Sequence, residues 1–130
     1  MRVMVIVKAT KEHEAGQRCS QELMAEMDRF NEKLKNAGVF LSIDGLQPSS
    51  KGARVKFSSK DRTVIDGPFA ETRDLVGGFW IWRVESMDEA IEWLKRAPFK
   101  NGEEVEIRPL LEPWEMTADP RLRQDEAVHR

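Results

Sequence analysis

The stretch "GGFWIWRV", residues 77–84, narrows the choice of fold more than any other part of the sequence. Successive side chains of a β-strand point to opposite faces of its sheet. Phe79 and Ile81 therefore face one way, while Trp80 and Trp82 face the other. Because both faces carry large apolar side chains, we expect a strand that is covered on both sides for most of its length.

Other strands are predicted where β-branched and aromatic residues stand between turn residues. They are "MRVMVIV", "GVFLSIDGL" and "EVEIRPL", together with "ARVKFSSKDRTVI", a hairpin that turns at "SSKDR". The joints "GLQPSSKG" and "DGPFAE" lie on either side of the hairpin, and both are rich in turn residues.

Two helices are predicted from their capping residues and apolar stripes. The first begins after Ser20 and closes at Gly38, a residue suited to a left-handed terminator. The second has Ser86 as its N-cap with Glu89 in a capping box, and Pro98 stops it. The segment "ATKEHEAGQRC" before the first helix is interpreted as a polar loop.

The order of these elements is that of an α+β ferredoxin-like sandwich, in which the helices stack on one face of an antiparallel sheet. We expect this domain to span residues 1–111, with a polar tail from 112 to 130 anchored by Trp114. The second face of such a sheet needs a cover. If Trp80 and Trp82 lie on it, the exposed apolar patch predicts a homodimer with two sheets back to back.

Composition excludes several classes of partner. The chain has 130 residues and a net charge of -2, without the basic excess of a nucleic-acid binder. No apolar run is long enough for a membrane span or a signal peptide. The single cysteine, Cys19, cannot form an internal disulfide, so the cytoplasm is the expected location. We find no metal-ligand spacing and no phosphate loop, and we expect neither a metal nor a cofactor.

The residues also carry a family resemblance. "DGPFAETRDLVGGFW", with "GVFLSIDGLQPSSKG" before it and "AIEWLKRAPF" after it, resembles the DGPF-domain branch of the YCII-related family. The resemblance spans the chain from Met1 to about Leu111. It implies a dimeric α/β barrel with a cleft near the dimer interface, and it implies no known reaction.

In YCII-type relatives a histidine of the first helix and an aspartate near the DGP turn are proposed as a catalytic pair. Asp66 corresponds to that aspartate, whereas the predicted helix contains no histidine. The histidines of this chain are His13 in the preceding loop and His129 in the tail. We interpret His13 as a solvated loop residue, although such loops can close over a pocket.

Asp66 is the candidate general base, and a structural interpretation stands beside it. An aspartate before Gly67-Pro68 can bond to the backbone of its own turn without any further function. To act as a base near neutral pH, it would need its pKa raised by desolvation. Phe69, Phe79 and Trp80 are the apolar residues that would supply this environment.

Four further residues are candidate ligand contacts. In an extended segment Glu71 and Arg73 point the same way, and Arg73 suits an anionic group, although both charges can also pair in solvent. Arg54 lines the cleft or keeps an edge strand soluble. Trp80 is more often a core or dimer contact than a ligand platform.

Two functions therefore remain open. The protein is either a ligand-binding or regulatory homodimer for an unknown small molecule, or a cofactor-free acid-base enzyme of isomerase or lyase type. In the enzyme, Asp66 is the base and Arg73 orients a small anionic substrate. We favour the first function because the sequence shows no complete catalytic set.

Overall fold

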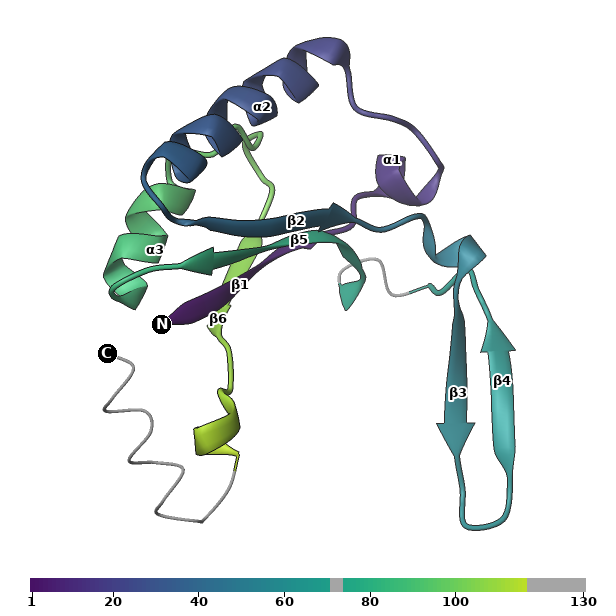
Figure 1. The fold of residues 1–130 in the computed structure, drawn as a ribbon. Coiled ribbons are helices and arrows are strands. Elements are labelled where there is room, and N and C mark those ends of the chain that lie inside the picture. Colours follow the sequence, from purple (N-terminus) through teal and green to yellow (C-terminus); the bar gives the residue numbers. More distant parts are fainter. Residues whose placement is uncertain (71–73, 117–130) are drawn as a thin grey trace.

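The computed structural model describes residues 1–70 and 74–116. Helices α2 and α3 lie together on one face of a four-stranded sheet, and a hairpin extends from the sheet on the other side (Figure 1). The elements are β1 (Arg2–Lys8), α1 (Lys11–Glu14), α2 (Gln21–Asn36), β2 (Phe40–Gly45), η1 (Ser49–Lys51), β3 (Ala53–Phe57), β4 (Arg62–Asp66), β5 (Val76–Arg83), α3 (Met87–Leu94), β6 (Val105–Pro109) and η3 (Pro113–Glu115).

The main sheet has the strand order β2-β5-β1-β6, and its neighbouring strands pair in antiparallel fashion. Helix α2 connects β1 to β2, and helix α3 connects β5 to β6. These two crossovers place β1 and β5 in the centre of the sheet. The predicted α+β fold with a ferredoxin-like arrangement is thus confirmed for one chain.

The predicted helix caps are present. The Ser20 hydroxyl accepts a hydrogen bond from the Leu23 N–H at 3.1 Å, and Gly38 after α2 has a φ of +74°. The Ser86 hydroxyl accepts from the Glu89 N–H at 3.1 Å. Among the described residues, none of the helices has the length and apolar character of a membrane span.

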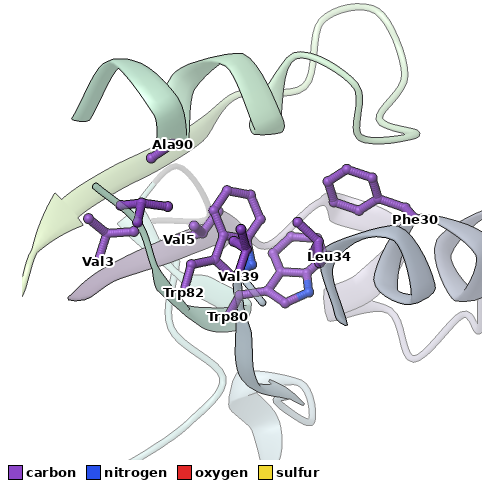
Figure 2. Packing of buried hydrophobic residues seen from close by; sticks show 9 residues of the cluster. Val3, Val5, Phe30, Leu34, Val39, Trp80, Trp82 and Ala90 are labelled. Carbon is purple, nitrogen blue, oxygen red and sulfur yellow. The ribbon is translucent and has the colours of Figure 1, made fainter. Parts of the chain in front are cut away.

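The packing of the hydrophobic core shows on which face of the sheet the two tryptophans lie. Trp80 and Trp82 are 1% and 0% exposed, and Figure 2 shows them packed with Phe30 and Leu34 of α2. The ring of Phe30 meets Trp80 edge-on, with 5.9 Å between centroids. Both tryptophans therefore lie on the helix-covered face, and the interpretation that they form the uncovered face is wrong.

The face of the sheet that is turned away from the helices carries apolar side chains other than the two tryptophans. Met4 lies opposite Ile81, and Ile6 lies opposite Phe79, on the two central strands. Alternation turns these four side chains away from the helices, and each is half-buried in the single chain. We call this group the open face. In Figure 1 the helices α2 and α3 lie on the opposite face of the sheet.

Strands β3 and β4 form a separate two-stranded sheet, as the hairpin prediction requires. All of their residues are exposed, and the hairpin extends on the side of the main sheet opposite to the helices (Figure 1). A two-stranded hairpin is marginally stable by itself in water. Its support must come from contacts at its base or from a partner.

The segment after β6 is tied to the first strand. The Arg2 guanidinium donates two hydrogen bonds to the Glu112 carboxylate, at 2.9 and 2.8 Å. This pairing lowers the pKa of Glu112 and raises that of Arg2. The half-buried Trp114 follows in η3. The boundary after residue 111 stays a prediction.

Candidate functional site

A mostly apolar cavity of about 640 Å³ lies between the first half of α2 and the end of the sheet where β1 stops and β5 begins. This volume falls in the range of small-molecule sites. Side chains from α2, the sheet and the loop after α3 form its apolar wall, among them Val7, Met24, Met27, Trp80, Phe99 and Val105.

A glycine of β5 leaves room for the cavity on the helix side of the sheet. Gly78 lies on the same face of β5 as Trp80, directly opposite Val7. A methyl group on Gly78 would come to 3.0 Å from the Asp44 carbonyl oxygen, and one on Gly77 to 3.3 Å from the Ala9 Cα. Because Gly78 has no side chain on the helix side, the layer occupied by Trp80 and Trp82 ends there and a hollow remains.

Trp80 is the predicted ligand contact that lies in the cavity wall. Its indole Nε1 donates a hydrogen bond to the Asn31 Oδ1 at 2.8 Å. This bond occupies the one polar group of the side chain and fixes the plane of the ring. Trp80 is therefore a rigid apolar part of the cavity wall, and its role as a ligand contact stays a prediction.

His13 is the residue that sequence reasoning placed wrongly. The predicted polar loop contains the short helix α1, whose N-cap Thr10 accepts a hydrogen bond from the His13 N–H at 3.0 Å. The His13 side chain is half-buried and lines the cavity. The available signal was Thr10 itself, an N-cap residue directly before "KEHE".

The imidazole of His13 brings a polar group into this apolar cavity. Its Nε2 atom is buried, and no group among the described residues forms a hydrogen bond with it. Buried polar atoms without a partner are rare and call for an explanation. Depending on its tautomer, Nε2 can donate a hydrogen bond to a bound molecule or accept one from it.

The lining of the cavity also includes charged residues of both signs, Lys8, Asp44, Lys100, Glu103 and Glu104. The Lys8 ammonium lies 3.2 Å from the Glu106 carboxylate. Cys19 also lines this region and is exposed. Within the described ranges, no group of three or more His, Cys, Asp or Glu is arranged to hold a metal ion.

Two other predicted site residues lie outside the cavity. Asp66 ends β4, is exposed, and its carboxylate forms no hydrogen bond with the described residues. The Arg54 guanidinium on β3 stacks over the Phe69 ring, 3.8 Å from its centroid. Glu71 and Arg73 fall outside the described residues. In the structure Trp80 and His13 thus line the same cavity. The role of Asp66 as a general base stays a prediction.

The DGPF turn packs against the segment before the hairpin. The Phe69 N–H donates to the Ser49 hydroxyl at 3.0 Å, and the Gly67 N–H donates to the Gly52 carbonyl at 3.0 Å. A Cβ on Gly67 would lie 1.8 Å from the Ser49 carbonyl oxygen. Position 67 therefore accepts only glycine at this close approach.

Glu14 joins this turn to the helix that carries His13. Its carboxylate accepts from the Ser49 N–H at 2.8 Å and also from the Ser49 hydroxyl. These two hydrogen bonds, the hydroxyl first, lower the pKa of Glu14 below its ordinary value of 4.5. We call the set Glu14, Ser49 and Phe69 the serine bridge.

Replacing Gly67 by alanine tests the close approach. Because the new methyl group would collide with backbone, we expect Gly67→Ala to lower the free energy of unfolding by about 1–3 kcal/mol. Urea unfolding followed by tryptophan fluorescence measures the change. Gly45→Ala is the matched control, since a Cβ there has no heavy atom within 4 Å. Equal stability of both variants would contradict the packing described.

The serine bridge predicts a pH-dependent stability. A carboxyl whose pKa is lowered in the folded state stabilises the protein above its unfolded pKa, and loses this effect as the pH falls through its folded pKa. We expect Glu14→Gln to be less stable than wild type near neutral pH, with a gap that closes in acid. Glu12→Gln removes a charge from the same helix without a bond to Ser49. A gap that is constant with pH, or shared by this control, would refute the prediction.

Comparisons with known proteins agree with the sequence resemblance at the family level. The YCII-related domain matches residues 1–115. An uncharacterised protein of Rhizobium meliloti (strain 1021) is 29% identical over 92 residues, which are 69% of this chain and 74% of that protein.

A solved structure with a partial likeness is the 5-chloro-2-hydroxyhydroquinone dehydrochlorinase (TftG) from Burkholderia phenoliruptrix AC1100, in complex with 2,5-dihydroxybenzoquinone. It is 18% identical to this chain, and the match covers 85% of this chain and 94% of that one, with a TM-score of 0.40. A likeness at this level assigns no activity. From the domain match over residues 1–115, the chain belongs to the YCII-related domain family.

Proposed function

We propose that this protein is a homodimer that binds a small, mostly apolar molecule, in a ligand-binding or regulatory role. The observation that carries the proposal is the cavity of about 640 Å³ with the unpartnered His13 Nε2 in its wall. The apolar wall favours an apolar ligand body. The imidazole favours a ligand with one hydrogen-bonding group, which would satisfy Nε2.

The homodimer is supported by the open face. Four half-buried apolar side chains on adjacent central strands form one continuous patch. Burial of such a patch against an identical one releases water from both, and a two-fold axis makes the patch complementary to itself. The dimeric α/β barrel is our proposal for this assembly. The heptapeptide Asp66 to Thr72, "DGPFAET", is the reason to place the chain in the DGPF branch of its family.

A cofactor-free acid-base enzyme is the second candidate. The observation in its favour is the exposed Asp66 carboxylate, which makes no hydrogen bond with the described residues and is accessible to a substrate. In this candidate Asp66 is the general base and Arg73 orients an anionic substrate. We rank it second because Asp66 does not line the cavity of its own chain.

Filling the cavity tests the first proposal. Met24 is 56% exposed on α2 and lines the cavity, so a larger side chain can enter the space without disturbing the core. We expect Met24→Trp to weaken binding of the apolar dye 1-anilinonaphthalene-8-sulfonate by about tenfold or more, measured by fluorescence titration. Ala25→Trp, at an exposed neighbour outside the cavity, should bind as wild type does. Unchanged dye affinity in Met24→Trp would place the binding elsewhere.

A substitution of Asp66 separates the two candidates. Asp66→Asn keeps an acceptor at the turn and removes its basicity. We expect dye affinity and thermal unfolding to match wild type, because Asp66 is exposed and outside the cavity. A screen that finds a small anionic molecule converted by wild type and not by Asp66→Asn would favour the enzyme instead.

A further inference from the structure

We propose that the β3–β4 hairpin is an arm that packs against a second copy of this chain. The inference rests on the proposed homodimer and adds to it a contact surface away from the open face. Its basis is a group of exposed apolar side chains on the hairpin, Val55, Phe57 and Val64.

One face of the hairpin carries three large apolar side chains, and the Arg62 guanidinium lies over one of them, 4.8 Å from the centroid of the Phe57 ring. Val55 and Val64 lie directly opposite each other across the two strands, and Phe57 lies two residues along β3 on the same side. Their exposed fractions are 48%, 65% and 70% for Val55, Val64 and Phe57. Apolar side chains that are exposed together on a strand lower the solubility of a protein. Surfaces of this kind often mark sites of protein–protein interaction.

The position of the hairpin indicates what covers this face. The hairpin extends from the main sheet on the side opposite to the helices, which is the side of the open face (Figure 1). A copy that pairs with the open face through a two-fold axis must therefore occupy space on the same side as the hairpin. The same axis sets the hairpin of that copy beside the first chain.

Charge also favours a second copy. The hairpin, residues 53–66, carries four basic residues and two aspartates, a net charge of +2, whereas the whole chain carries -2. The remainder of the chain therefore carries -4. A basic arm against an acidic body is complementary between two identical molecules, and this attraction favours their encounter.

The base of the arm is held in a defined orientation. The Phe69 ring lies under the Arg54 guanidinium, and the Phe69 N–H is bonded to Ser49. The Gly67 N–H is bonded to Gly52 on the other side of the hairpin base. An arm fixed at its root loses less conformational entropy when it docks, which strengthens the contact.

The test is the self-association of the full chain, measured by sedimentation equilibrium. We expect Phe57→Ser/Val64→Thr to raise the dimer dissociation constant by about tenfold or more, as for loss of a central apolar contact. Both residues are exposed in the single chain, so circular dichroism should show an unchanged fold. The matched control is Ile91→Thr, which removes an apolar group that is 40% exposed on α3. It should dimerise as wild type does.

The outcomes separate the arm from the dimer itself. If the double variant dimerises with the wild-type constant, the arm proposal is wrong and the dimer through the open face stands. If wild type stays monomeric at every concentration, both proposals fail. The full-length wild type is also tested for binding to heparin, a polyanion. If it binds heparin and does not self-associate, the hairpin would belong to an acidic partner and our inference would be wrong.

Cross-linking locates the contact directly. A photoreactive p-benzoylphenylalanine at position 64 is activated in a mixture of ¹⁴N-labelled and ¹⁵N-labelled chains, and the cross-linked peptides are identified by mass spectrometry. We expect peptides that combine the two isotopes, because the arm touches a different molecule. Cross-links confined to peptides of one isotope would place position 64 against its own chain and contradict the proposal.

Discussion

The packing of Trp80 and Trp82 beneath α2 sets the spacing on which the rest of the structure depends. Two indole rings in one layer hold the helix away from the sheet by the thickness of a large aromatic side chain. At Gly78, one step further along the same face of β5, that layer has no side chain. The hollow beside Trp80 is thus a by-product of the core, and its rigid wall and apolar character come from the same residues that stabilise the fold.

The strands, both long helices and their caps could be predicted from the sequence, because they depend on local alternation and on single capping residues such as Ser20 and Ser86. The face taken by the tryptophans could not. Alternation divides a strand into two sides, but which side the helices cover depends on the volume available in three dimensions. Helix α1 was missed because four residues are too few to show a helical period.

The candidate site was only partly accessible to sequence reasoning. Trp80, a predicted ligand contact, lies in the wall of the cavity, and whether it touches a ligand stays a prediction. His13 was placed in solvent because its burial depends on how the loop after β1 returns to α2. The DGPF turn attracts attention as a motif, yet in the described chain the contacts of Gly67 and Phe69 are those of a packed corner. A short motif with demanding backbone geometry looks alike in sequence whether it serves packing or chemistry.

The serine bridge has a mechanical consequence. One serine side chain is bonded both to the helix that presents His13 and to the turn at the root of the hairpin. A displacement of α1 by an occupant of the cavity changes the same hydrogen bonds that orient the hairpin, and a load on the hairpin acts back on α1. Ser49 is therefore the residue through which binding in the cavity and contacts of the hairpin can influence each other, and any such coupling free energy is the same in both directions.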